Sequence, residues 1–148
     1  MNQKLVPELC VSDITRSRAF YEGLLGFTVL WERPEEGFVY LSREGAELML
    51  DQITPQTAAR GFLIGDLRYP HGRGISLQIE TTDVDTLYAS VLEADARITL
   101  KMEEKWYRAG DHELGNRQFI TADPDGYLLR FFSDLGRRPR LVQPDTNN

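Results

Sequence analysis

The chain has few of the residues from which metal and redox sites are built. Its 148 residues include one cysteine, Cys10, and two histidines, His71 and His112. A single cysteine excludes an internal disulfide and every CxxC metal or redox motif. No apolar run approaches the ~18 residues needed to span a bilayer, and the N-terminal MNQKLVPELC lacks the basic and long apolar segments of a signal peptide. We therefore expect a cytoplasmic protein with no membrane partner.

Positive charge is also scarce. The chain has 17 Lys and Arg against 23 Asp and Glu, which gives a net charge of -6 and a pI near 4.9. This balance argues against a nucleic-acid partner and favours a neutral or cationic ligand, although acidity also confers solubility. With 41% hydrophobic residues, the chain is long enough to bury one core. The sequence thus predicts one globular domain, or two small halves that share a core.

An internal repeat divides the chain into two halves. The segment LCVSDITRSRAFYEGLLGF from Leu9 aligns with IETTDVDTLYASVLEADAR from Ile79 at an offset of 70 residues. Each copy reads as a strand, a helix cap and a helix, and Asp13 and Asp83 are the predicted N-caps. The first helix is expected to end at Gly26. The predicted buried helix faces comprise Ile14, Ser17, Phe20, Tyr21 and Leu24 in the first copy and Val84, Leu87, Tyr88 and Val91 in the second.

After each helix the pattern becomes extended, so each half is predicted to be β-α-β-β-β. The turn before the last strand of the second half is Asp123-Pro124-Asp125-Gly126, in which proline presets φ and glycine leaves without steric cost. The predicted strands after the helices are 27–31, 38–41 and 46–50, then 98–102, 117–122 and 127–132. The predicted organisation is module one at about 4–51, a connection at 52–74, module two at about 75–134 and a frayed tail at 135–148.

Two β-α-β-β-β copies with a DPDG turn before the last strand resemble the vicinal oxygen chelate superfamily. That superfamily includes glyoxalase I, extradiol dioxygenases, fosfomycin-modifying enzymes and bleomycin-binding resistance proteins. The resemblance covers about residues 4–134, and PELCVSDITRSRAFYEGLLGF, EGAELMLDQ and the segment from Trp106 to Phe131 are most similar to the bleomycin-binding proteins. It implies an α+β fold of two curled mixed sheets around a shared cavity. It also implies a two-fold homodimer in which the partner chain helps to close that cavity.

Alternation along the first strand of each half predicts which side chains face the cavity. In the first half, Glu8 is expected on the cavity side. In the second half, Ser76, Gln78 and Glu80 are expected there. The residues expected to be buried against the helices are Leu5, Leu9, Val11, Ile75, Leu77 and Ile79.

The resemblance implies that the metal ligands of the enzymes fall at Val6, near Glu47, at Ser76 and at Arg130. A catalytic divalent ion needs about three ligands from His, Asp, Glu or Cys. Valine has no lone pair, serine is a poor neutral ligand, and a guanidinium would repel the ion. We therefore expect no metal, no other cofactor and no catalytic residue. Because an unpaired buried charge is costly, we also expect Arg130 to pair with Glu8, Glu47 or Glu80.

The predicted ligand-binding residues are aromatic or polar side chains of the strands: Phe38, Tyr40, Gln78, Trp106, Tyr107, Arg117 and Arg130. Trp106 and Tyr107 lie in a segment similar to the one that carries a drug-stacking tryptophan in bleomycin-binding proteins. Plain packing is the alternative for Trp106, and an ion pair that braces the DPDG turn is the alternative for Arg117. Nearby acidic residues could attract a cationic ligand or form a solvated loop.

The leading functional hypothesis is a metal-free protein that sequesters a bulky aromatic or cationic small molecule, such as a glycopeptide antibiotic. The first alternative is a metal-dependent lyase, isomerase or dioxygenase with a ligand set that includes Glu47 and His112. The second is a module for regulation or assembly with a vestigial pocket. The connection from Gln52 to Gly74 is long compared with the usual loop of about 4 to 6 residues, so we expect it to reach a partner chain.

Overall fold

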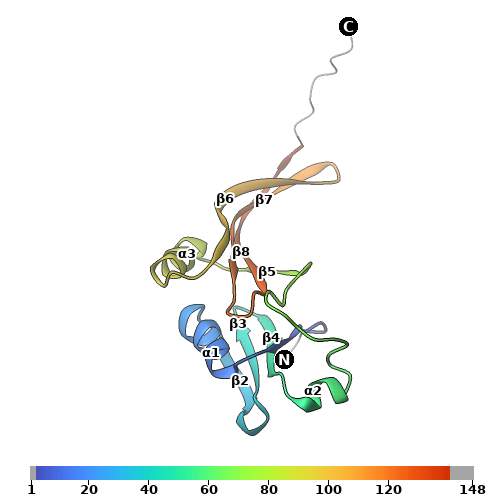
Figure 1. The fold of residues 1–148 in the computed structure, drawn as a ribbon. Helices are drawn as coiled ribbons and strands as arrows, with labels where there is room; N and C mark the ends of the chain where they lie inside the picture. The colour runs from blue at the N-terminus through green and yellow to red at the C-terminus, as the bar shows by residue number, and fades with distance from the viewer. Residues whose placement is uncertain (1–2, 141–148) are drawn as a thin grey trace.

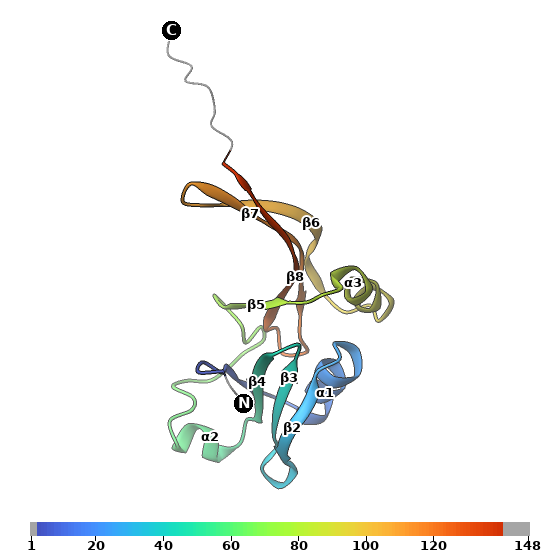
Figure 2. The same ribbon diagram turned by 180° about the vertical axis from the view of Figure 1, so that it is seen from behind.

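The computed structural model describes residues 3–140 and consists of two four-stranded mixed sheets with helices (Figures 1 and 2). The first module comprises β1 (Glu8–Val11), α1 (Ile14–Arg18), a π-helix (Ala19–Leu24), β2 (Thr28–Arg33), a 3-10 turn (Pro34–Glu36), β3 (Phe38–Arg43) and β4 (Ala46–Gln52). The second module comprises β5 (Ser76–Glu80), α3 (Val84–Glu93), β6 (Ile98–Ala109), β7 (His112–Ala122) and β8 (Leu128–Pro139).

Both sheets have the same topology. The strand orders are β1-β4-β3-β2 and β5-β8-β7-β6, and in each sheet the first strand pairs in parallel with the last. The remaining pairs are antiparallel. The predicted α+β fold of two β-α-β-β-β modules is therefore confirmed. No helix within residues 3–140 has the length and apolar character needed to cross a membrane.

The helix starts follow the predicted caps. The Asp13 carboxylate accepts a hydrogen bond from the Arg16 N–H at 3.2 Å, and the Asp83 carboxylate accepts one from the Thr86 N–H at 3.1 Å. Both side chains satisfy backbone donors that the first helical turn leaves free. After α1 and the π-helix, the chain turns at Gly26 with a φ of +80°, a conformation that favours glycine.

The core lies between the sheets and the helices. Tyr21, Phe119 and Phe131 are its largest fully buried side chains, so residues of both modules share one core. Leu9, Val11 and Ile79 are buried as predicted, and Leu77 packs partly buried against the core.

The prediction of burial is wrong for two residues of the same alternating series. Leu5 is 81% exposed and Ile75 is 52% exposed. Strand β1 begins only at Glu8 and β5 only at Ser76, so both residues precede their strands. The alternation rule therefore fails at these two positions because it was extended beyond the ends of the strands.

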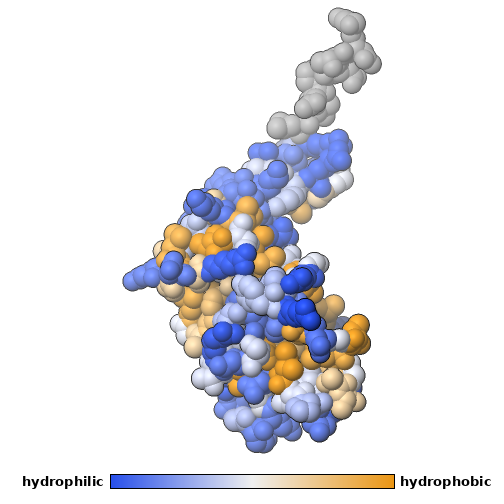
Figure 3. Space-filling view, viewed as in Figure 1, coloured by the Kyte–Doolittle hydropathy of each residue, from blue (hydrophilic) through white to orange (hydrophobic). Residues whose placement is uncertain are grey.

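Strands β6, β7 and β8 extend beyond the body of the molecule as a long three-stranded arm (Figures 1 and 2). Figure 3 shows that mainly hydrophilic residues cover this arm. The prediction of a frayed tail is wrong for residues 135–139, because Gly136 pairs with Gly115 and Pro139 pairs with His112. Backbone hydrogen bonds hold this segment whatever the polarity of its side chains. The remainder of the predicted tail, 141–148, lies outside the described residues.

The connection between the modules folds against its own chain. It contains a short helix, α2 (Pro55–Ala59), with a capping box between Thr54 and Thr57 that was not predicted from the sequence. Its last part lies on the DPDG turn, where the His71 N–H donates to the Asp125 carbonyl at 2.8 Å. This part of the connection therefore contacts module two of its own chain.

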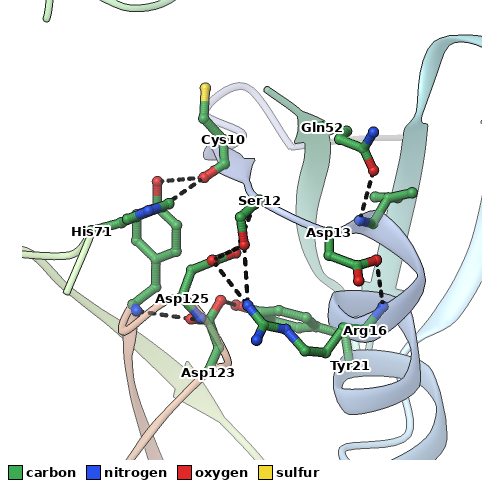
Figure 4. A network of polar contacts seen from close by, with 11 residues as sticks. Cys10, Ser12, Asp13, Arg16, Tyr21, Gln52, His71, Asp123 and Asp125 are labelled. Carbon is green, nitrogen blue, oxygen red and sulfur yellow. Dashed lines mark hydrogen bonds and ion pairs between the residues drawn. The ribbon is translucent and has the colours of Figure 1, made fainter. Parts of the chain in front are cut away.

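Carboxylates of the DPDG turn tie module two to module one (Figure 4). The buried Asp125 carboxylate accepts hydrogen bonds from the Ser12 N–H at 3.1 Å and the Ser12 hydroxyl at 2.5 Å. Asp123 accepts from the Tyr21 hydroxyl at 2.8 Å and from the N–H groups of Asp125 and Tyr127. Burial raises the pKa of both Asp123 and Tyr21.

In a matching contact, a carboxylate of module one binds the helix start of module two. The hairpin turn before β4 carries Glu44, whose carboxylate accepts from the Thr82 N–H at 3.2 Å and from the Thr82 hydroxyl at 2.6 Å. These hydrogen bonds lower the pKa of Glu44. Thr82 and Ser12 are related by the repeat offset of 70, and each directly precedes the N-cap of its helix. The last hairpin of each module thus holds the helix start of the other module.

Candidate functional site

Each sheet carries a pocket, and that of sheet 1 is bordered by α2 and by Ile14 at the start of α1 as well as by strands. The sheet-1 pocket, defined by residues of β1 to β4, their connecting 3-10 turn and the connection, has a volume of about 810 Å³. The sheet-2 pocket, defined by residues of β5 to β8, has a volume of about 380 Å³. The lining of the first includes Glu8, Trp31, Arg33, Phe38, Asp51 and Phe62. The lining of the second includes Gln78, Glu80, Tyr107, Asn116, Arg130 and Phe132.

The sheet-1 pocket combines aromatic rings with a pair of carboxyl groups. The carboxyl groups of Glu8 and Asp51 are close enough to interact, and burial raises the pKa of both. Repulsion by the charge on Asp51 raises the pKa of Glu8 further. The Arg33 guanidinium lies 3.9 Å from the centre of the Phe38 ring, in a cation–π contact, and its charge opposes both increases. The pocket can therefore contact an aromatic ligand surface and offers both acceptors and a donor.

The sheet-2 pocket lies beside a network of polar side chains. The Gln118 amide donates to the Tyr107 hydroxyl oxygen at 2.6 Å and to the Glu103 carboxylate at 3.0 Å. The Arg130 guanidinium donates to the Gln78 side-chain oxygen, and more weakly, at 3.4 Å, to the Tyr107 hydroxyl oxygen. These contacts hold the polar groups in fixed positions on the concave face.

The profile of the Glyoxalase/Bleomycin resistance protein/Dioxygenase superfamily matches residues 5–131. The chain belongs to this superfamily. It is 27% identical over 143 residues to the bleomycin resistance protein of Geobacillus stearothermophilus, across 88% of this chain and 96% of that protein. The same identity and coverage hold for the bleomycin resistance protein of Staphylococcus aureus.

Two solved structures are also similar to this chain. A superfamily member from Vibrio splendidus is 40% identical, with 87% of this chain and 97% of that chain covered, although its TM-score is 0.39. A protein of unknown function from Agrobacterium tumefaciens is 22% identical and has a TM-score of 0.69, with 91% and 97% covered. The second structure therefore supports the fold of this superfamily member and nothing beyond it.

Four of the seven predicted ligand residues line the two pockets. Gln78, Tyr107 and Arg130 meet in the sheet-2 pocket, and Phe38 lines the sheet-1 pocket. Tyr40 lies beside the latter pocket as a buried residue. Its ring stacks on Trp31 at a centroid distance of 4.0 Å, and its hydroxyl donates to Glu47 at 2.6 Å. Glu8 and Glu80 also line pockets, whereas Ser76 is exposed at the start of β5.

The structure does not bring Trp106 and Arg117 to either pocket. Trp106 follows the alternation of β6, so it points away from the face on which Tyr107 lies. Its ring covers Gly115 and lies 4.1 Å from the Arg138 guanidinium, which corresponds to the packing alternative. Arg117 donates to the Asp85 carboxylate of α3 at 2.7 Å. Arg117 thus braces α3 against sheet 2. The alternative considered from the sequence was an ion pair that braces the DPDG turn.

The positions at which the resemblance implies metal ligands do not fit a catalytic ion. Val6 and Glu47 belong to module one, whereas Ser76 and Arg130 lie in sheet 2. Across residues 3–140 no three His, Cys, Asp or Glu side chains are grouped so that they could hold a metal ion. Glu47 and His112, the ligands of the enzyme alternative, lie in different sheets, and His112 contacts Asp111 at the tip of the arm.

The predicted ion pair of Arg130 with a glutamate is wrong. Among residues 3–140 no carboxylate lies within ion-pair distance of Arg130, whose side-chain partners are the neutral Gln78 and Tyr107. The reason is strand register, because β5 places Gln78 directly opposite Arg130 and Glu80 opposite Phe132. Sequence alternation gives the face of each residue but not its cross-strand neighbour.

Sequence reasoning missed Asp51 and Arg33, both of which line the sheet-1 pocket. A signal for Asp51 was present, because it lies four residues after Glu47 on β4 and therefore on the same face. No comparable signal identified Arg33, which follows the bulge between Val29 and Trp31 in the pairing of β2 with β3. A bulge shifts the alternation by one residue and changes the face of all later side chains.

Proposed function

We propose that this chain is a non-catalytic binding protein that sequesters a bulky amphipathic small molecule, such as a glycopeptide antibiotic, on its two concave sheet faces. The observation that carries this proposal is the chemistry of these faces. They combine aromatic rings with hydrogen-bonding groups, and Val6, Ser76 and Arg130 stand where the resemblance implies metal ligands. Groups of this kind can bind a ligand but cannot polarise a substrate as a metal ion does.

Pocket size supports the proposal. Small-molecule sites commonly enclose about 300 to 1,000 Å³, and the sheet-1 and sheet-2 pockets have volumes of about 810 and 380 Å³. Aromatic side chains such as Phe38 and Tyr107 present large contact areas with few rotatable bonds, so little conformational entropy is lost on binding. The likeness to bleomycin resistance proteins is consistent with a ligand of that class.

We propose further that the protein acts as a homodimer in which sheet 1 of one chain covers sheet 2 of its partner. Both concave faces are open in the single chain, and an open curled sheet is commonly covered by another layer. The arm presents exposed hydrophobic side chains beside the sheet-2 pocket, among them Tyr107 and Leu114. Such exposed groups are typical of contact surfaces. The proposed partners are thus a small-molecule ligand and a second copy of the chain.

Titration calorimetry with metal-free bleomycin tests the proposed function. We expect saturable binding to wild-type protein, with the same affinity in buffer that contains a chelator, because no ion takes part. Phe38→Ala should weaken binding by about tenfold through the loss of a buried aromatic contact. A matched control is Leu92→Ala, which removes an exposed hydrophobic side chain from α3, outside both pockets, and should leave the affinity unchanged.

Two results would contradict the proposal. Absence of heat and of any melting-temperature shift with bleomycin would argue against sequestration of this ligand class. Loss of binding in chelator, restored by a divalent ion, would instead favour the metal-dependent alternative. Sedimentation velocity on the same samples tests the dimer, since a monomer that binds at full stoichiometry would contradict a pocket built from two chains.

A further inference from the structure

Partly buried arginines of this protein almost all have a carboxylate partner. Five arginines within residues 3–140 have partly buried side chains, and four of them form ion pairs of 2.6 to 2.8 Å. These pairs are Arg18 with Glu22, Arg43 with Glu44, Arg117 with Asp85 and Arg138 with Glu113. The fifth is Arg130, and in the same part of the chain no carboxylate reaches it. The exception lies in the sheet-2 pocket.

The contacts of Arg130 leave much of its hydrogen-bonding capacity unused. Its two side-chain partners, the Gln78 side-chain oxygen and the Tyr107 hydroxyl oxygen, carry no charge. The Nε atom is buried and has no hydrogen-bond partner. A guanidinium offers five N–H donors in one plane, and a partly desolvated cation is costly unless an anion compensates it. Among residues 3–140 no carboxylate lies close enough to supply that anion.

We infer that the sheet-2 pocket binds an oxyanion of its ligand, a carboxylate, sulfonate or sulfate group, at the Arg130 guanidinium. The inference rests on the proposed function and specifies the ligand chemistry of one of its two faces. Gln78 and Tyr107 fix the plane of the guanidinium, so that two of its N–H groups can meet two oxygens of one anion. Leu114 and Phe132 line the same pocket and supply apolar contact. The ligand group that matches this face is therefore an oxyanion on an apolar scaffold, whatever charge the rest of the ligand carries.

Three carboxylates modulate this site. Glu80 and Asp134 are exposed and line the pocket, and Glu103 is held by the Gln118 amide at 3.0 Å. They lie beyond ion-pair distance from Arg130, so they do not neutralise it but repel an incoming anion. Loss of one of these negative charges should therefore strengthen anion binding. An increase in anion affinity on removal of a carboxylate therefore distinguishes an anion site from a pocket that merely excludes water.

Two fluorescent dyes that share the same aromatic rings test the inference. The probes are 8-anilinonaphthalene-1-sulfonate, which carries one sulfonate, and the neutral N-phenyl-1-naphthylamine. We expect Arg130→Gln to weaken sulfonate binding about tenfold, because a charged hydrogen-bonded pair is lost, and to leave the neutral dye within about twofold. Glu80→Gln should tighten sulfonate binding about two- to threefold. Arg108→Gln removes the same charge from the exposed arm and should change neither affinity.

The outcomes separate this inference from the proposed function. Unchanged sulfonate affinity in Arg130→Gln, with the neutral dye still bound, would overturn the anion site and leave the binding function intact. If the sulfonate dye does not bind the wild-type protein, the anion site is overturned, whereas calorimetry with bleomycin decides the proposed function separately. Circular dichroism melts check that each variant is folded. Should Arg130→Gln fail to fold, two other variants test the anion site. Arg130→Lys should lower the sulfonate affinity and Glu80→Gln should raise it, and the absence of both changes would overturn the inference.

Discussion

The two modules share one scaffold but differ in their concave faces. Each has the same strand order, the same aspartate cap and the same carboxylate contact to the other module. Yet sheet 1 presents a carboxyl pair, Glu8 and Asp51, whereas sheet 2 presents Arg130 without an anion. The side chains on the buried face of each strand therefore specify the fold. The side chains on the concave face can differ between the modules, and they determine what each face can bind.

The two inter-module contacts also differ, although their geometry is alike. Asp125 is 3% exposed and lies within a network that includes Ser12 and Arg16. The Glu44 side chain is 34% exposed. Hydrogen bonds to a buried charge contribute more than those to a charge that water can solvate. The DPDG turn should therefore be the stronger of the two links between the modules.

The turn glycines should reveal this difference most strongly. Gly126 and Gly45 have φ values of +85° and +89°, so alanine is strained at both, by about 1 to 2 kcal/mol. At Gly126 a Cβ would also lie 2.5 Å from the Cβ of Pro70, whereas Gly45 faces open space. We expect Gly126→Ala to lower the free energy of unfolding by about 3 to 4 kcal/mol and Gly45→Ala by about 1 to 2. Urea denaturation checks this, and equal losses would contradict the unequal packing.

The carboxylates give the next largest effect. Asp125→Ala should destabilise the protein by about 2 to 3 kcal/mol, because it leaves the Ser12 donors without a partner in a buried site. Glu44→Ala should cost about 1 kcal/mol or less. Double-mutant cycles with Ser12→Ala and Thr82→Ala measure the two coupling energies directly. A coupling energy that is larger for Glu44 than for Asp125 would reverse the proposed ranking.

The smallest expected effect concerns pH. Burial raises the pKa of Glu8, so its carboxylate opposes folding above that pKa, and the favourable protonated form is lost as pH rises through it. The pKa of Glu44 is lowered, so its contribution is present at neutral pH and is lost on acidification. Glu8→Gln should therefore stabilise the protein at pH 7, and Glu44→Gln should destabilise it, each by less than about 1 kcal/mol. Both differences should diminish as the pH is lowered, because both carboxylates become protonated in the folded and the unfolded protein, and denaturation at several pH values checks this.

The sequence predicted the scaffold well because the scaffold depends on local signals. Helix caps at Asp13 and Asp83, the DPDG turn and the repeat are all visible within a few residues of chain. The pairing of β8 with β7 as far as Pro139 was missed, because strand pairing compensates for a polar composition.

The candidate site was predicted only in part, because it depends on register. Alternation correctly placed Gln78 and Arg130 on one face, but only the pairing of β5 with β8 shows that they are neighbours. Trp106 and Tyr107 are adjacent in sequence and must lie on opposite faces of a strand, so at most one of them could line the pocket. Asp51 and Arg33 were missed for related reasons, since bulges and neighbouring strands determine their surroundings.

The central claim is that the concave sheet faces bind the ligand. Amide chemical shifts of uniformly ¹⁵N-labelled protein, recorded while metal-free bleomycin is added in chelator, test it most directly. We expect saturable shifts for residues of the concave faces, such as Phe38, Gln78 and Arg130, and none for Asp85 or Thr86 on helix α3. Saturable shifts confined to the helices, or no shifts at millimolar ligand, would contradict it.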